Sequence, residues 1–419
     1  MADKPRSRPL RLLHVHSSFD PGGKELRTVQ LINRFGKGVM HTVASAVPGA
    51  TGALGHVARG IPVLAINLPG LGGTPGPIKL RALANAMKPY DLILTYNWGA
   101  MNAVLAHSAF GPSLGLAGLI HHEDGFNADE ATGLKPSRNA YRMLALARAQ
   151  ALVVPSTILR NIALETWRQP PDKVHLIPNG VATARFSAKP KRDVLPRLIK
   201  HPGELWLGTF AGLRAVKNLP RLVRAFAALP EPWHLVIAGE GPERSVILAE
   251  AELCHVADRV HLAGFVADPA ALIGLFDLYA LSSDSEQAPI SVIEAMAAGL
   301  AVASPAVGDV AAMVGAANQA YVTTPGDEAA LAAALRELAD APAPAQDHWD
   351  RKSRQGTRRI RRGRDGFSPR RALCAGDGAR ALPLRLGASS PAVHALRSKN
   401  IEMMPPLAKR AADQPDPPN

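Results

Sequence analysis

The sequence is poor in cysteine and contains no long apolar run. Its 419 residues include only Cys254 and Cys374, which are too few and too far apart for a disulfide framework or a zinc cluster. No apolar run approaches the roughly 18–20 residues that a membrane-spanning helix needs. The start of the chain is basic, but its apolar stretch is cut short by His14 and His16, so we expect no signal peptide. We therefore expect a cytoplasmic protein, and the length is enough for two domains.

The excess of positive charge lies mainly at one end of the chain. The net charge is +13, but residues 341–419 contain 16 Lys and Arg against 7 Asp and Glu, which leaves 32 against 28 in the preceding 340 residues. The charge therefore says little about what the body of the protein binds. In the basic segment only Trp349 and Phe367 could stack on bases, so we expect no specific nucleic-acid partner.

Short β-branched or aliphatic runs alternate with helix-like segments from residue 10 onwards. This alternation is typical of parallel strands joined by right-handed crossovers. It predicts an α/β fold with two Rossmann-like, doubly wound domains at 1–182 and 204–340, joined by a linker at 183–203 that is rich in Pro, Lys and Arg. Because ligands bind at the carboxyl ends of such strands, a cleft between the two domains is expected.

The expected elements follow from these patterns. Strands are predicted at 10–16, 41–47, 62–68, 91–97, 116–122, 151–156, 205–212, 233–240, 259–265, 278–283 and 300–305. The clearest helices are predicted at 25–36, 219–229, 242–253, 268–276, 289–298 and 327–340.

The amino-acid composition and the pattern of apolar residues change after residue 340. Residues 341–419 show neither a helical nor a strand period and are dense in Arg, Pro, Gly and Ala. One interpretation is a disordered basic tail. The other is an out-of-frame translation of GC-rich DNA, because the break falls where a last helix should follow.

The stretch SDSEQAPISVIEAMAAG contains two glutamates with seven residues between them. Glu286 lies in a turn after a predicted strand, and Glu294 lies inside the following apolar helix, which Pro289 is well placed to start. The helix N-terminus is a natural site for phosphate. A charge embedded in an apolar run is costly, so Glu294 is a candidate to accept hydrogen bonds from vicinal hydroxyls such as those of a ribose.

Three further motifs follow predicted strands. Arg214 and Lys217 come after the first strand of the second domain, where two cations can neutralise a diphosphate. Gly22 and Gly23 form a tight turn after the first strand and allow a ligand to approach the backbone closely. The run HHED begins at His121, but its spacing does not match a metal site.

These motifs together resemble a GT-B glycosyltransferase of family 4, the "glycosyl transferases group 1". The matching segments are GGKELRTVQL, LIPNGV, GLRAVKNLPRLVRAF, LVIAGEGPER, VHLAGFVAD and SDSEQAPISVIEAMAAGLAVASPAVGDVAAMV. They cover roughly residues 10–340, and the last one is similar to the E-x7-E signature of the family. The resemblance implies a retaining transferase that moves a sugar from a nucleotide-diphosphate sugar to a hydroxyl acceptor.

The resemblance also implies a role for each matching residue. Arg214 and Lys217 would hold the donor diphosphate, Glu294 the ribose, and Glu286 the donor sugar near its reacting carbon. The backbone of the donor turn, which we define as Gln287, Ala288, Pro289 and Ile290, would cradle sugar and phosphate. Gly22 and Gly23 would lie against the donor phosphate and the acceptor side, and His121, or its neighbour His122, would approach the donor sugar.

Cofactors, partners and alternatives follow from the same resemblance. No metal and no cofactor are expected, because the leaving diphosphate itself assists deprotonation of the acceptor. The acceptor would be a saccharide or a lipid-linked one in polysaccharide or glycolipid synthesis, and a lipid-linked acceptor would bring the protein to the inner face of the membrane. Family members usually end in helices that return to the N-terminal domain, and residues 341–419 predict none. This difference makes a catalytically impaired nucleotide-sugar-binding protein one alternative. A GT-B epimerase, which would need no separate acceptor, is the other.

Overall fold

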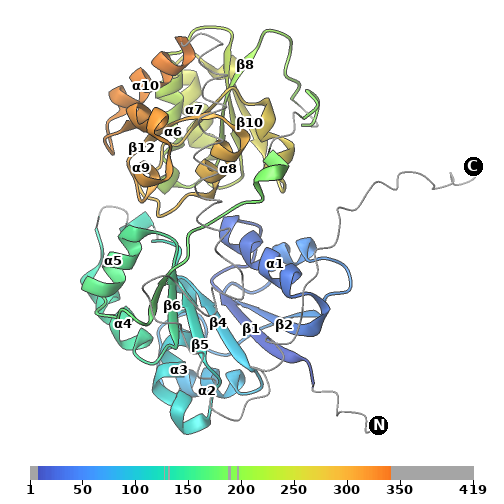
Figure 1. Ribbon diagram of the computed structural model, residues 1–419, viewed down its shortest axis with the longest axis vertical. Coiled ribbons are helices and arrows are strands. Elements are labelled where there is room, and N and C mark those ends of the chain that lie inside the picture. Colours follow the sequence, from blue (N-terminus) through green and yellow to red (C-terminus); the bar gives the residue numbers. More distant parts are fainter. Residues whose placement is uncertain (1–7, 127, 131–132, 187–189, 196–197, 341–419) are drawn as a thin grey trace, which may run out of the picture. The chain divides into compact units, whose positions relative to one another are not determined.

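A computed structural model describes residues 8–126, 128–130, 133–186, 190–195 and 198–340 (Figure 1). The segment 341–419, with both interpretations offered for it, lies outside the described residues. Within the described chain, two sheets of parallel strands form, one in each predicted domain. We call the parts of the chain that carry them the N-terminal half and the C-terminal half.

The N-terminal half contains a seven-stranded sheet in the order β3-β2-β1-β4-β5-β6-β7, and all of its pairings are parallel. The strands are β1 (Leu10–His16), β2 (Val39–Ser45), β3 (Val63–Ile66), β4 (Leu92–Tyr96), β5 (Leu119–His122), β6 (Ala151–Val154) and β7 (Val174–Leu176). The helices are α1 (Gly23–Phe35), α2 (Pro77–Met87), α3 (Met101–Leu114), α4 (Pro136–Leu146) and α5 (Thr157–Glu165).

Helices cover both faces of this sheet because alternate residues of each buried strand point to opposite sides. Ala44 of β2 packs in the cluster that α2, α3, α4 and α5 share with the sheet. Its neighbour Val43 points the other way and packs on Val29 and Ile32 of α1. The predicted α/β architecture is therefore confirmed for the N-terminal half.

The C-terminal half contains a six-stranded sheet in the order β10-β9-β8-β11-β12-β13, again with parallel pairings. The strands are β8 (Leu205–Phe210), β9 (Trp233–Ala238), β10 (Val260–Gly264), β11 (Leu278–Ala280), β12 (Ala301–Pro305) and β13 (Val322–Thr323). The helices are α6 (Leu219–Phe226), α7 (Arg244–Leu253), α8 (Ile290–Ala298), α9 (Val310–Met313) and α10 (Glu328–Asp340).

One expected helix is wrong. Residues 268–276 form two short 3-10 turns, Pro269–Ala271 and Ile273–Leu275, instead of a continuous helix. Pro269 suits only the start of a helix, and Gly274 in its middle weakens it. Asp268 caps the first turn by accepting a hydrogen bond from the amide of Ala270 at 3.2 Å. The two-residue strand β13 was not expected either, because it is too short to show a period.

Both sheets have a point where the order of strands reverses, between β1 and β4 and between β8 and β11. Loops that leave the two strands at such a point diverge to opposite faces, and the crevice between them is where α/β proteins bind ligands. In the C-terminal half, the loop after β8 carries Arg214 and Lys217, and the loop after β11 carries Glu286. The fold therefore places these three predicted residues on the two sides of one reversal point.

Candidate active site

Two of the predicted residues are in direct contact at this reversal point. The ammonium of Lys217 lies 2.5 Å from Oε1 of Glu286. The same oxygen accepts a hydrogen bond from the hydroxyl of Ser283 at 2.8 Å. Both charged groups are only partly buried, with side-chain exposures of 26% and 12%. Lys217 ends a 3-10 turn, Ala215–Lys217, and Arg214 lies exposed just before that turn.

The donor turn packs against a glycine, Gly308, that no sequence motif singles out. Gly308 follows β12 and has a φ of +56°. A β-carbon built on it would lie 2.3 Å from the carbonyl oxygen of Gln287 and 2.6 Å from that of Glu286. The next residue, Asp309, donates its amide to the same Gln287 carbonyl at 2.8 Å. Only glycine allows this close approach, so Gly308 supports the shape of the turn that follows Glu286.

Glu294 lies on α8, in the environment that the apolar run SVIEAMAAG predicts. Burial raises the pKa of its carboxyl group to about 7; the negative field of Asp268 acts in the same direction and Arg185 opposes both. Helix α8 ends at Gly299, which adopts the left-handed conformation at φ 87°. At neutral pH this carboxyl group is therefore close to its titration point.

The glycine pair of the N-terminal half starts a helix, as predicted. Gly22 is the N-cap of α1 and Gly23 is its first residue. A β-carbon on Gly22 would lie 2.6 Å from Oε2 of Glu25, so the side chain of Glu25 folds back over the glycine backbone. Burial raises the pKa of Glu25, which is 5% exposed. A carboxylate of the chain itself thus lies at the amino end of α1.

His121 and His122 are the last two residues of β5, so their side chains point to opposite faces of the sheet. The ring of His121 is fully buried, and its Nδ1 is hydrogen-bonded to Thr95 Oγ1 at 2.9 Å. The ring of His122 stacks on Tyr96 with 4.9 Å between the ring centroids. Burial lowers the pKa of His122 to about 3, so this imidazole is neutral at physiological pH. Of the two, His122 is the one left partly accessible.

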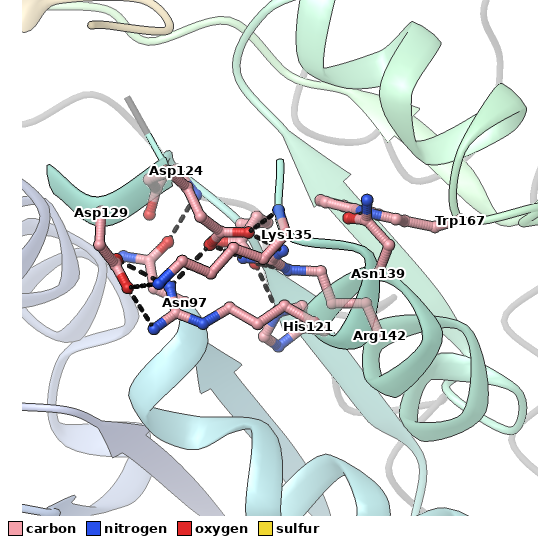
Figure 2. A network of polar contacts seen from close by, with 11 residues as sticks. Asn97, His121, Asp124, Asp129, Lys135, Asn139, Arg142 and Trp167 are labelled. Carbon is pink, nitrogen blue, oxygen red and sulfur yellow. Dashed lines mark hydrogen bonds and ion pairs between the residues drawn. The ribbon is translucent and has the colours of Figure 1, made fainter. Parts of the chain in front are cut away.

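A buried ionic network lies next to His121, and it was not expected from the sequence (Figure 2). Arg142 of α4 is fully buried and donates from both terminal nitrogens to the carboxylate of Glu130, at 3.0 Å each. Its guanidinium also lies about 5 Å from the ring centres of three aromatic residues, Trp98, Phe126 and Trp167. The helical spacing of the sequence around Arg142 does not reveal that this side chain is buried.

Glu123 adds a second buried carboxylate to this network. Its Oε2 lies 3.6 Å from Nε of Arg142 and 3.7 Å from Nε2 of His121, and neither carboxylate oxygen has a hydrogen-bond partner. Its neighbour Asp124 accepts a hydrogen bond from Arg27 of α1 at 2.6 Å. The HHED run thus supplies internal contacts of the N-terminal half.

Polar side chains from the N-terminal half reach the donor turn. The hydroxyl of Ser156, the N-cap of α5, donates to the side-chain oxygen of Gln287 at 3.0 Å. The side-chain amide of Asn179, in the LIPNGV segment, donates to the carbonyl of Ala288 at 2.8 Å. On Gly23, a β-carbon would lie 3.7 Å from Ile290. The structure therefore brings Gly23 and the donor turn together, while the ring of His121 remains enclosed.

The described residues contain neither a candidate metal cluster nor a helix able to span a membrane. No group of three or more His, Cys, Asp and Glu side chains in the described ranges is arranged to hold a metal ion. Among the helices that the structure describes, none combines the length and apolar character needed to cross a membrane.

Two family models match the chain, one in each half. The model "Glycosyltransferase Family 4" matches residues 21–185, and the model "Glycosyl transferases group 1" matches residues 199–356. Together they contain every residue that the sequence singled out, from Gly22 to Glu294.

Individual relatives are distant. The chain is 26% identical over 239 residues to the N-acetyl-alpha-D-glucosaminyl L-malate synthase of Bacillus anthracis, a match that covers 56% of this chain and 60% of that protein. It is 25% identical to the putative glycosyltransferase EpsF of Bacillus subtilis, over 69% of this chain and 77% of the relative. The fold is similar to that of Anabaena Alr3699/HepE in complex with UDP and glucose, with a TM-score of 0.66, 19% identity, and coverage of 85% of this chain and 100% of the other.

Proposed function

The chain belongs to the glycosyltransferases of group 1 and family 4, and we propose that it transfers a sugar from a nucleotide-diphosphate sugar to a hydroxyl acceptor with retention of configuration. The observation that carries the proposal is the placement of Lys217 and Glu286 at the β8–β11 reversal point, with Arg214 in the same loop. A diphosphate and a sugar are the two parts of such a donor, and this site offers cations for one and a carboxylate for the other.

Each residue has one task in this proposal. Arg214 and Lys217 stabilise the negative charge that grows on the leaving diphosphate. Glu294 accepts hydrogen bonds from the ribose hydroxyls, and Glu286 contacts the sugar near its anomeric carbon. The backbone of the donor turn lies at the amino end of α8, where free amide groups favour phosphate oxygens. Of the two histidines at the end of β5, we assign this contact with the sugar to His122, because the ring of His121 is enclosed.

In the reaction the bond between the anomeric carbon and the phosphate oxygen breaks, and the acceptor oxygen bonds to the same face of that carbon. The acceptor proton passes to an oxygen of the departing diphosphate. The chain's own residues hold the two reactants and stabilise the leaving group, and no metal or cofactor takes part. The acceptor would be a saccharide or a lipid-linked one, used on the cytoplasmic side of a membrane.

The test compares donor turnover with donor binding. Radiolabelled UDP-, GDP- and ADP-sugars are incubated with the full chain and a panel of saccharide and lipid-linked acceptors. Transfer of label to an acceptor, with the anomeric configuration of the donor kept in the product, supports the proposal. Donor binding without turnover would instead indicate the impaired nucleotide-sugar-binding protein, and conversion of the donor sugar without any acceptor would indicate an epimerase.

A further inference from the structure

The loop that carries Lys217 is tied to the loop that carries Glu286 by side chains that the proposed function does not use. Asp284, two residues before Glu286, donates its amide to the carbonyl of Val216 at 2.9 Å. Ser282 donates its hydroxyl to the carbonyl of Lys217 at 2.9 Å. The backbone on both sides of Lys217 is thus anchored across the β8–β11 reversal point.

The carboxylate of Asp284 is the centre of a second set of contacts. It accepts hydrogen bonds from the side-chain amide of Asn218 at 3.1 and 3.2 Å, and it pairs with the guanidinium of Arg221 at 2.7 Å. The same guanidinium donates to the carbonyl of Ser282 at 3.1 Å. One carboxylate therefore connects the residue after Lys217, the first turn of α6 and the loop after β11.

Asn218 adopts an unfavourable backbone conformation. Its backbone is left-handed, with φ 43° and ψ 50°, a region that few residues other than glycine adopt and that asparagine tolerates. Its side-chain oxygen also caps α6 by accepting the amide of Arg221 at 3.4 Å. Asparagine thus allows the chain to change direction after the Lys217 turn, and its side-chain amide donates hydrogen bonds to Asp284.

We propose that Asp284, acting with Asn218 and Arg221, is a positioning residue that fixes the ammonium of Lys217 where the donor diphosphate is to bind. The inference rests on the proposed function. A lysine side chain is a flexible stem with a compact charge, so the place of its ammonium depends on where the backbone holds it. A shift of about 1 Å in a group that must meet a reacting phosphate can cost on the order of 100-fold in rate.

Because the side chain of Asp284 is partly exposed, its role in positioning Lys217 can be distinguished from a contribution to folding stability. The side chain of Asp284 is 37% exposed, and ion pairs exposed to that degree contribute little to folding. Asp284→Ala should therefore leave the melting temperature nearly unchanged while it lowers the affinity for a nucleoside diphosphate. A purely structural role would give the opposite pattern.

The test measures the affinity for UDP, GDP and ADP by calorimetry on the full chain. For the nucleoside diphosphate that wild type binds most tightly, we expect Asp284→Ala and Lys217→Ala each to weaken binding about tenfold or more. Because Asp284 acts through Lys217, the double variant should bind as Lys217→Ala does. The control is Asp258→Ala, at an exposed position before β10, at the opposite end of the strands. Asp284→Asn, which keeps an acceptor oxygen, should lie between wild type and Asp284→Ala.

Three outcomes decide between the claims. Wild-type affinity in Asp284→Ala, or losses that add in the double variant, would overturn the positioning role while leaving the proposed function intact. A large fall in melting temperature without loss of affinity would show that Asp284 stabilises the fold and does not position Lys217. If wild type binds none of the three nucleotides, the proposed function fails and the inference fails with it.

Discussion

Lys217 and Glu286 form an ion pair across the β8–β11 reversal point, with 2.5 Å between Nζ and Oε1. If Lys217 binds the donor diphosphate, its ammonium must leave the carboxylate of Glu286 and pair with phosphate oxygens. The pair is partly exposed to solvent, and such pairs contribute only about 0–1 kcal/mol to folding. Each partner can therefore be removed without unfolding the chain, which makes the pair a clean place to test function.

We expect Lys217→Ala and Glu286→Ala each to lower kcat/KM for sugar transfer by about 100-fold or more, because each removes a preorganised polar contact with the reacting groups. Initial rates with the preferred donor measure the effect. The exposed Lys88→Ala, at the end of α2, is the matched control and should keep wild-type rates. Near-normal turnover in either site variant would refute its assigned role.

Glu294 should make donor binding depend on pH near neutrality. Its pKa is raised to about 7, so the carboxylate that we propose accepts hydrogen bonds from ribose hydroxyls becomes fully ionised only above that pH. Donor affinity should therefore rise between pH 6 and 8, and Glu294→Gln should bind the donor more weakly with a flat profile over this range. Calorimetric titrations at several pH values supply the comparison, and an unchanged affinity in the variant would count against the ribose contact.

The same carboxyl group should also affect stability. A raised pKa means that the folded chain binds this proton more tightly than the unfolded chain does, so its contribution falls as the pH rises from about 4.5 to 7. The loss is at most about 3 kcal/mol. Glu294→Gln should remove this decline, and urea unfolding at pH 5 and 8 would show it. A decline equal to that of wild type would mean that Glu294 is not the group responsible.

Gly308→Ala should damage donor binding, because the added β-carbon would collide with the carbonyl oxygens of Gln287 and Glu286. The matched control is Gly326→Ala, which has a similar left-handed backbone at φ 84° but open space around the position of the β-carbon. Both variants carry the cost of about 1 kcal/mol that alanine pays in that conformation. Only Gly308→Ala should lose donor affinity, by about tenfold or more; equal losses would point to backbone strain alone.

Arg142→Ala should strongly destabilise the N-terminal half. It would leave the carboxylate of Glu130 buried without its main partner, and breaking a buried pair from one side costs about 3–5 kcal/mol. Arg148→Ala, at an exposed position after α4, should cost less than about 0.5 kcal/mol. Chemical unfolding of the two variants gives the comparison, and similar midpoints would show that the network in Figure 2 contributes little to stability.

Buried histidines on β1 and β2 should make the chain sensitive to acid. His14 and His41 share a hydrogen bond of 3.0 Å, and burial lowers their pKa values to about 3 and about 4. Between pH 6.5 and 4 the unfolded chain binds more protons than the folded one, so stability is lost as the pH falls. His41→Gln should flatten this part of the profile, whereas the exposed His56→Gln should follow wild type. Parallel profiles for all three would contradict the assignment.

The sequence predicted those elements whose local signals agree with their place in the fold. Helix α8 combines a starting Pro289, an apolar run and a terminal Gly299, and it begins and ends within one residue of the prediction. The segment 268–276 had helical spacing too, but Pro269 and Gly274 lie inside it, and it became two short turns. Local composition decides an element only where its start, middle and end favour the same structure.

The sequence motifs predict individual site residues, but they do not predict the contacts between residues of different motifs. Lys217 and Glu286 were named from their motifs, but their contact depends on the order of β8 and β11, which spacing alone does not show. The sequence does not distinguish Arg142 from other helical charges, since its burial depends on three aromatic rings that are distant in sequence. Gly308 showed no special pattern, since its role comes from carbonyls about twenty residues earlier.

We propose above all that the loops after β8 and β11 bind a nucleotide-diphosphate sugar through Lys217. The most direct measurement is the change in melting temperature on adding UDP-, GDP- or ADP-glucose to wild type and to Lys217→Ala. We predict that at least one donor raises the melting temperature of wild type, and that the rise is clearly smaller in the variant at the same concentration. No rise with any donor, or an equal rise in both proteins, would contradict the account.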